Sequence, residues 1–250
     1  MRVPQPISTL TLTVALAVAP VLAAAAAADT RLEMKSHTDA FQMMGQSQPA
    51  QDKTITFWFT DDRVLRDDGE NAFLYRSDQN KLYLIDHPAE TFSTLSLPID
   101  FLALLPAETR AQMEGFLDQM SMNATVTPTD ERKEINGWSS RRYDVHMENQ
   151  LGMKLDSTVW ATEEIGTDLG AFRGLFAARG ALEPGGASAV DELLKVQGIP
   201  VVSETTIEGM GGKFASKEEL VSAEQAAAPA GTYEVPAGYT EVTFNPMGNR

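Results

Sequence analysis

The segment NAFLYRSDQNKLYLIDHPAETFSTL, residues 71–95, is the most regular part of the chain and decides the class of fold. Three runs rich in aromatic, aliphatic and β-branched residues are separated by the turn-forming segments Asp78–Asn80 and His87–Ala89. The pattern predicts three strands joined by tight turns, at Ala72–Ser77, Lys81–Asp86 and Thr91–Leu97. Consecutive strands with such short connections pair antiparallel.

The same kind of pattern continues toward the N-terminus. Residues 54–60 alternate with Ile55, Phe57 and Phe59 on one face, and a short strand follows at Arg63–Arg66. These segments complete a predicted meander of five strands. Earlier strands are expected at Arg31–His37 and Ala40–Gln46.

The pattern changes to a helical one after Pro98. Apolar residues recur at i, i+3, i+4 and i+7, which predicts an amphipathic helix over residues 106–121. The recurring residues are Met113, Phe116, Leu117 and Met120. A second apolar helix face over residues 169–176 is expected to end at Gly180, with a flexible loop at 181–189 and a short helix near 190–194. The face consists of Leu169, Phe172, Leu175 and Phe176.

Strands dominate the rest of the chain. They are expected at Thr125–Thr127, Gly137–Met147, Met153–Thr162, Ile199–Thr206, Gly212–Val221 and Thr232–Val235. Many consecutive antiparallel strands interrupted twice by helices predict an α+β protein built on one strongly curved antiparallel sheet. A sheet this large must curl, close or be covered, so we expect the helices to cover its concave face and to leave an apolar groove there.

The N-terminal residues 1–28 have the anatomy of a secretory signal peptide. A basic Arg2 precedes an uncharged stretch rich in alanine, leucine and valine, which ends in several Ala-x-Ala cleavage frames before Asp29. An uncleaved membrane anchor is the alternative, but alanine and threonine favour insertion weakly and Pro20 interrupts the stretch. We expect residues 29–250 to form a single domain, with no stable membrane insertion once the signal is cleaved.

Composition excludes several classes of function. The formal net charge of −15 makes nucleic acid and anionic lipid surfaces poor partners. The chain has no cysteine, which excludes thiol nucleophiles, thiolate metal sites and the acylated cysteine of a bacterial lipoprotein. We therefore expect a soluble protein of the bacterial periplasm.

The succession of strand segments resembles a known family. The segments are TITFWFTDDRVLRDD (54–68), AFLYRSDQNKLYLIDHPAETFSTL (72–95), NGWSSRRYDVHM (136–147), STVWATEEI (157–165), GIPVVSETTI (198–207) and GTYEVPAGYTEV (231–242). Behind a signal peptide, they resemble a family of bacterial envelope proteins described only as a domain of unknown function and related to the LolA/LolB-like lipoprotein carriers. The resemblance implies an unclosed β-barrel with helices over or inside its concave face, and in such carriers the cavity binds acyl chains. The resemblance does not assign a carrier's functional residue to any position of this chain.

A groove of this kind would be lined by the apolar faces of the strands and helices. The candidates are Ile55, Phe57, Phe59, Leu82, Leu84, Phe92, Met113, Phe116, Leu117, Met120, Phe172 and Phe176. For each single position, ordinary core packing is the competing interpretation. The run 82–85 is apolar on both strand faces, which indicates that something covers both faces or binds there.

The expected function is non-enzymatic binding of an apolar or acyl ligand, such as a lipid or a lipoprotein acyl chain, without a cofactor. The chain lacks the G-x-S-x-G, Walker and G-x-G-x-x-G motifs, and its histidines, His37, His87 and His146, lack paired metal spacing. An envelope protein–protein module and a hydrolase with a convergent acid/base site remain as alternatives. Methionine pairs could bind Cu(I), as an alternative to packing in the core. The acidic run 67–70 could form a weak calcium site, as an alternative to a simple turn.

Overall fold

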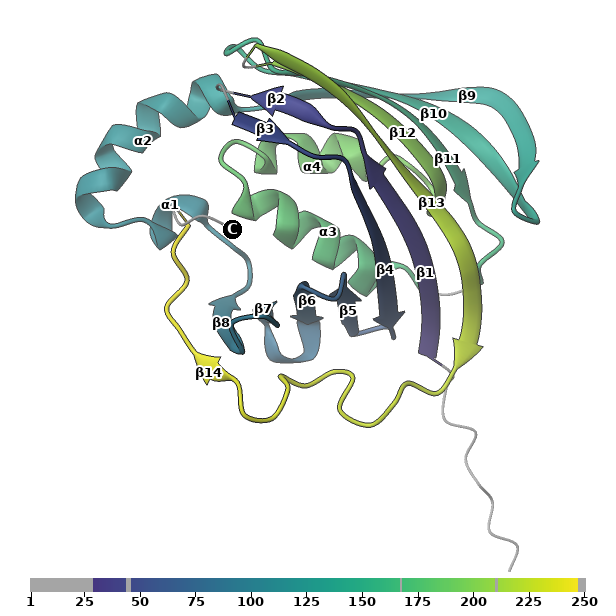
Figure 1. Ribbon diagram of the computed structural model, residues 1–250, viewed down its shortest axis with the longest axis horizontal. Coiled ribbons are helices and arrows are strands. Elements are labelled where there is room, and N and C mark those ends of the chain that lie inside the picture. The colour runs from purple at the N-terminus through teal and green to yellow at the C-terminus, as the bar shows by residue number, and fades with distance from the viewer. Residues whose placement is uncertain (1–28, 44–45, 167, 210, 247–250) are drawn as a thin grey trace, which may run out of the picture.

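The computed structural model describes residues 29–43, 46–166, 168–209 and 211–246. The predicted signal peptide, residues 1–28, lies outside this part of the chain. Most described strands form a single large sheet that curves around two helices (Figure 1). The expected α+β class with a strongly curved antiparallel sheet is confirmed.

The large sheet contains twelve strands of the described chain and has two free edges. In spatial order they are β14 (Thr240–Glu241), β8 (Thr91–Ser96), β7 (Lys81–Asp86), β6 (Asn71–Arg76), β5 (Arg63–Asp67), β4 (Gln51–Phe59), β1 (Asp29–Thr38), β13 (Gly212–Ala226), β12 (Ile199–Gly209), β11 (Lys154–Thr162), β10 (Trp138–Glu148) and β9 (Asn123–Ile135). Neighbouring strands pair antiparallel except β14, which pairs parallel with β8. A separate hairpin joins β2 (Phe41–Met43) to β3 (Gln46–Gln48). The meander β4–β8 is the one predicted from the sequence.

Helices α3 (Gly170–Leu182) and α4 (Ala187–Leu193) lie in the hollow of the sheet (Figure 1). Helices α1 (Phe101–Leu104) and α2 (Ala107–Met120) lie at its rim, and a 3-10 turn, η1, spans Ser77–Gln79. The expectation that the helix at 106–121 covers the concave face was wrong, because none of the residues of α2 is buried. Within the described residues, no helix is long and apolar enough to span a membrane.

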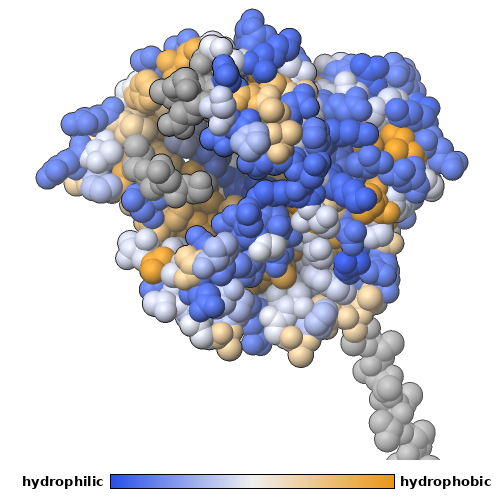
Figure 2. Space-filling view, viewed as in Figure 1, coloured by the Kyte–Doolittle hydropathy of each residue, from blue (hydrophilic) through white to orange (hydrophobic). Residues whose placement is uncertain are grey.

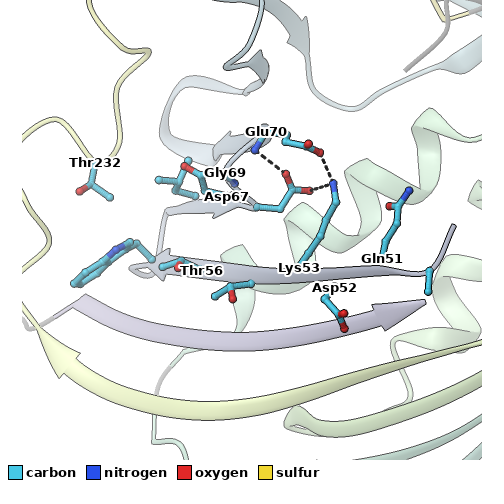
Figure 3. Close-up of a pocket in the computed structure, with 13 residues that line it drawn as sticks. Gln51, Asp52, Lys53, Thr56, Asp67, Gly69, Glu70 and Thr232 are labelled. Atoms are coloured by element: carbon cyan, nitrogen blue, oxygen red, sulfur yellow. Dashed lines mark hydrogen bonds and ion pairs between the residues drawn. The ribbon is translucent and has the colours of Figure 1, made fainter. Parts of the chain in front are cut away.

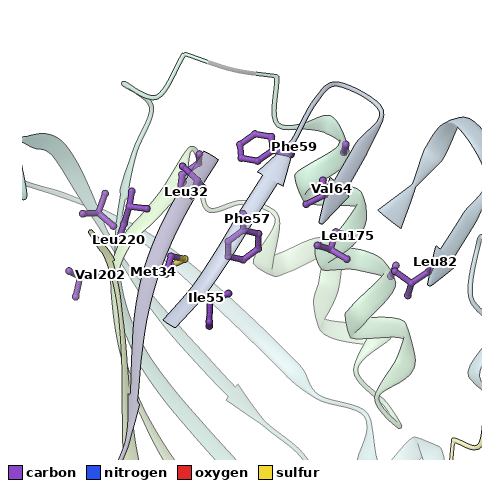
Figure 4. Packing of buried hydrophobic residues seen from close by; sticks show 14 of the residues in the cluster. Leu32, Met34, Ile55, Phe57, Phe59, Val64, Leu82, Leu175, Val202 and Leu220 are labelled. Atoms are coloured by element: carbon purple, nitrogen blue, oxygen red, sulfur yellow. The ribbon is translucent and has the colours of Figure 1, made fainter. Parts of the chain in front are cut away.

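The main core fills the space between α3 and the concave face of the sheet. Leu32, Phe59, Val64, Leu82 and Leu220 are fully buried there, and Figure 4 shows Leu175 of α3 turned toward the strands that carry them. Burying each such side chain stabilises the fold by about 1.5–3 kcal/mol. This packing fixes α3 against one half of the sheet.

A second apolar layer lies on the convex face of strands β5–β8. Leu74 and Ile85 are buried there under Tyr233 and Tyr239, which belong to the C-terminal segment, residues 227–246, that follows β13. This segment runs back along the sheet, pairs with β8 through β14 and continues toward α1 (Figure 1). It explains why residues 82–85 are apolar on both faces: Leu82 faces the main core and Ile85 faces the C-terminal segment.

Four local predictions were wrong. The single strand expected at Ala40–Gln46 is instead part of the β2–β3 hairpin, with residues 44–45 outside the described chain. The strand expected at Thr232–Val235 is a series of turns, in which the N–H of Thr232 donates to the carbonyl oxygen of Pro229 and the N–H of Glu234 to that of Gly231. Helix α3 continues through Gly180 to Leu182, and α4 begins at Ala187, so the flexible loop expected at 181–189 shrinks to four residues. Strand β9 reaches Ile135, far beyond the expected Thr127.

The glycine at position 180 has a packing role that the sequence pattern did not reveal. A Cβ built on it would come 2.7 Å from Cγ2 of Val190 in α4. The residue therefore lets α3 and α4 approach closely, instead of ending α3. The two helices together form one wall of the groove described below.

Candidate apolar groove

A groove of about 350 Å³ lies between α3, α4 and the concave face of β10–β13. Its strand wall consists mainly of Val145 and Met147 of β10 with Leu155 and Val159 of β11. Alternation along each strand places these side chains on the concave face, while His146 and Asp156 between them point to the convex face. The sequence therefore builds an apolar wall by the ordinary period-2 pattern.

A short polar strip crosses this wall. Ser157 and Thr205 are register partners on β11 and β12, and their hydroxyl oxygens are 2.6 Å apart. Both residues line the groove. The bond between the two hydroxyls uses one of their two O–H donors and so satisfies part of the hydrogen-bonding capacity of the strip.

The helical wall is aromatic. Phe172 and Phe176 are one turn apart on α3, and Leu193 and Leu194 close the α4 side. The ring centroid of Phe172 lies 5.6 Å from that of Phe57, which fixes its position against the sheet. Phe176 remains 41% exposed, so much of its apolar surface faces the groove and solvent.

Gly198 brings the end of this wall against the sheet. Its φ angle is +84°, and a Cβ at this position would overlap the carbonyl oxygen of Thr162. Only glycine adopts this conformation at such close range without strain. The turn carries the chain from α4 directly into β12 at the edge of the groove.

Two arginines and one glutamate complete the lining, Arg173, Arg179 and Glu218. The guanidinium of Arg179 lies 4.8 Å from the ring centroid of Phe73 on β6. Desolvation by the neighbouring protein lowers the pKa of Arg179 to about 10, and repulsion from Arg66 acts in the same direction. The carboxylates of Glu218, Glu183 and Asp68 oppose this shift without cancelling it.

The structure divides the predicted groove residues into four groups. Phe57, Phe172 and Phe176 line the groove, whereas Ile55, Phe59, Leu82 and Leu84 pack in the main core. Phe92 lies on the opposite face of the sheet, in the layer under the C-terminal segment. The α2 residues Met113, Phe116, Leu117 and Met120 do not line the groove.

Sequence reasoning missed the strand wall and Arg179. The alternation of Val145 and Met147 and of Leu155 and Val159 was visible in strands that the sequence predicted correctly. This alternation did not show which face of the strands the helices cover. Arg179 continues the Phe172–Phe176 stripe at i+7, a spacing that could have placed it on the same helix face.

A larger but open pocket of about 950 Å³ lies on the convex face of β4 and β5 (Figure 3). Nζ of Lys53 lies 2.7 Å from Oε2 of Glu70 and 3.8 Å from Oδ2 of Asp68. Burial works to raise the pKa of Asp68, but hydrogen bonds from the backbone N–H groups of Asn71 and Glu70, with Arg66 and Lys53 nearby, bring it below its ordinary value. Lys53, the cation of this pocket's lining, is thus paired with carboxylates of the neighbouring turn.

The acidic run 67–70 forms a turn, as the turn role considered for it in the sequence predicts. The N–H of Gly69 donates to Oδ1 of Asp67, and the N–H of Asn71 donates to Oδ1 of Asp68. Among the described residues, no group of three histidine, aspartate or glutamate side chains is placed to hold a metal ion. The calcium alternative therefore gains no support from the geometry.

The three histidines occupy separate places. Nδ1 of His37 lies 2.7 Å from Oδ1 of Asp52, and Nδ1 of His146 lies 2.7 Å from Oδ1 of Asp156. These hydrogen-bonded carboxylates raise the pKa of both imidazoles. His87 lies beneath the C-terminal segment and bonds to Tyr239.

Comparison with known proteins identifies a family. The model of the family described as Domain of unknown function (DUF4412) matches residues 43–239, which confirms that part of the resemblance seen in the sequence. No curated protein matches the chain. A crystal structure from Vibrio parahaemolyticus, assigned provisionally as an outer membrane lipoprotein-sorting protein domain, is similar with 6% identity and a TM-score of 0.28, over 82% of this chain and 89% of that one. A TM-score this low carries no argument, so the LolA-like relationship stays a prediction.

Proposed function

The chain belongs to the DUF4412 family, and we propose that it binds a single apolar or acyl chain in the groove beneath α3 and α4 and does not convert it chemically. One observation carries this proposal. One half of the concave face is packed solidly against α3. Beside the other half, a groove of about 350 Å³ remains open between two mainly apolar walls.

The dimensions and the lining of the groove favour a slim ligand. Ligand pockets commonly measure about 300–1,000 Å³, and this groove lies at the low end of that range. Met34 and Met147 contribute unbranched, pliable side chains, which adapt to ligands of variable shape. Phe176 offers an exposed aromatic surface against which a chain could pack.

The signal-peptide pattern of residues 1–28 supports a location in the bacterial periplasm. A groove that shields an apolar chain from water would serve sequestration or delivery of lipid or lipoprotein acyl chains within the envelope. We propose a binding role without chemistry for a chain that lacks the G-x-S-x-G, Walker and G-x-G-x-x-G motifs.

The groove is tested by a matched pair of phenylalanine substitutions. Phe176 lines it and is 41% exposed, while Phe116 on α2 is 42% exposed and lies outside the lining. We expect Phe176→Ala to weaken binding of a fluorescent fatty acid about tenfold, equivalent to about 1.4 kcal/mol. Phe116→Ala should leave the affinity unchanged. Absence of fatty-acid binding by the wild-type protein, or equal effects of both substitutions, would contradict the proposal.

A second candidate function rests on α2. Its stripe Met113, Phe116, Leu117 and Met120 is only partly covered, and Figure 2 shows the surface hollowed on the side where α2 lies, with apolar residues around the hollow. Exposed apolar patches often mark protein–protein interaction sites. A photo-crosslinking residue at Phe116 should then trap a specific envelope protein in cells, whereas one at exposed Arg132 should not.

A further inference from the structure

The groove lining contains a cation, Arg179, whose surroundings favour the binding of an anionic group. Arg179 lies in the last turn of α3 and lines the groove beside the strand wall, where its side chain is exposed to solvent. Its guanidinium rests on the face of Phe73, and the C-terminal end of the helix dipole favours its charge. These contacts hold the cation in place, and within the part of the chain that the structure describes no carboxylate lies at ion-pair distance from its N–H donors, although a planar carboxylate is the acceptor that a guanidinium binds best.

The neighbouring charges do not neutralise Arg179. Arg66 also lies over Phe73, at 5.9 Å, and Nη1 of Arg66 is 3.3 Å from Oδ2 of Asp68, so this carboxylate already has a partner. Glu218 lines the groove and attracts Arg179, but Arg173 lines it as well, so the charged lining carries two cations and one anion. Desolvation, and after it repulsion from Arg66, lower the pKa of Arg179 to about 10, so the side chain is still charged at neutral pH.

The position of Arg179 along the helix gives the ligand a direction. Phe172, Phe176 and Arg179 follow one another at i, i+4 and i+7, so the two rings and the guanidinium lie along one face of α3. An acyl chain packed against the two rings would place its end group next to the arginine. A carboxylate or a phosphate at that end accepts two parallel N–H bonds from the guanidinium fork.

We propose that the groove selects a single-chain anionic amphiphile, with the acyl chain along Phe172 and Phe176 and the acidic head group against Arg179. The inference rests on the proposed function, because it names the class of ligand for the same groove. The shared chemistry of the head group is a planar or tetrahedral oxyanion, which a fatty acid supplies as a carboxylate and a lysophospholipid as a phosphate.

The test is a competition experiment on the purified protein with ligands below their critical micelle concentrations. A bound fluorescent fatty acid is displaced by palmitate, by 1-palmitoyl lysophosphatidate, or by neutral 1-monopalmitoylglycerol, which all carry the same chain. We expect the better of the two acidic ligands to bind at least tenfold more tightly than the neutral one. The comparison of palmitate with lysophosphatidate then distinguishes a carboxylate source from a phosphate source.

Variants of Arg179 assign the selectivity to this residue. Arg179→Gln should abolish the preference, so that acidic and neutral ligands bind with similar affinity, while Arg179→Lys should retain part of the preference because it keeps the charge without the fork. Arg132→Gln is the matched control, because it removes the same charge from the exposed edge strand β9. It should leave all three affinities as in the wild type.

The outcomes separate this inference from the proposed function. Equal binding of acidic and neutral ligands by the wild-type protein would overturn the head-group inference while the groove proposal stands. Acidic preference that survives in Arg179→Gln would also overturn it. Binding of none of the ligands would refute the groove proposal itself, and the inference with it.

Discussion

The hydroxyl of Tyr239 lies 2.9 Å from Nδ1 of His87, although 152 positions separate the two residues in the chain. Their rings meet edge to face, with centroids 5.9 Å apart. The contact ties the C-terminal segment to the turn between β7 and β8, next to the parallel pair β14–β8. The segment thereby shields Leu74 and Ile85 from water on the convex face.

Two substitutions of Tyr239, one milder and one more severe, should weaken the attachment of this segment to different degrees. Tyr239→Phe removes the hydrogen bond and should lower the free energy of unfolding by about 0.5–1.5 kcal/mol. Tyr239→Ala also removes the ring over the convex apolar layer and should cost more, about 1–3 kcal/mol. Urea unfolding monitored by tryptophan fluorescence measures both. Unchanged stability of Tyr239→Ala would show that the segment does not support the sheet.

Alanine substitutions at the neighbouring positions 175 and 176 of α3 should differ strongly in their effect on the free energy of unfolding. Leu175 is 2% exposed in the main core, so Leu175→Ala should destabilise the fold by about 2–5 kcal/mol. Phe176→Ala should change the unfolding free energy by only about 0.5 kcal/mol, because its side chain is largely exposed. Thermal and urea unfolding give the comparison. A large loss of stability in Phe176→Ala would mean that the ring is part of the core and does not belong to an open groove.

Gly198 should resist any replacement. Alanine there would have to adopt a φ near +84° and would overlap the carbonyl oxygen of Thr162. The strain should lower the free energy of unfolding by about 1–3 kcal/mol. Gly69 provides the control, since it also has a positive φ but a Cβ on it would meet nothing within 4 Å. Equal effects of Gly198→Ala and Gly69→Ala would show that the close approach at Gly198 has no energetic weight.

His37 and His146 should titrate above the ordinary histidine pKa of about 6.5. Hydrogen bonds to Asp52 and to Asp156 respectively are the largest causes, and both raise the pKa. A raised folded-state pKa means that each pair stabilises the fold fully below the unfolded-state value and that the contribution disappears as the pH rises through the folded-state value. NMR titration of the imidazole protons should show both shifts, and Asp52→Asn should lower the pKa of His37 while leaving His146 unchanged. A pKa of His37 that does not respond to Asp52→Asn would contradict the pairing.

The strands β4–β8 could be predicted because their signals are local. Alternation at period 2 and turn residues such as Asp78–Asn80 depend only on neighbouring positions, and β7 has the predicted boundaries. The Asn136-Gly137 turn between β9 and β10 follows the same rule, since both residues have positive φ. Strand β9 beyond Thr127 was missed because its outer part is mostly polar and exposed, so it carries no apolar alternation.

What covers each face could not be read from the sequence. The stripe on α2 predicted a helix correctly, yet periodicity does not show whether an apolar stripe meets the sheet or stays exposed. Phe92 was assigned to the wrong face because Phe92 and Leu95 carry apolar side chains to opposite faces of β8, and both faces are covered. The nearness of Arg179 to Phe73 depends on how α3 packs on the sheet, which joins residues more than a hundred positions apart.

Native mass spectrometry tests the central claim most directly. The protein would be purified from periplasm without detergent, weighed under native conditions, and then extracted with organic solvent to identify whatever accompanies it. The account predicts a stoichiometric adduct with the mass of a single-chain lipid, and loss of that adduct in Phe176→Ala but not in Phe116→Ala. A clean apo mass that takes up neither added fatty acid nor added lysophospholipid would contradict ligand binding in the groove.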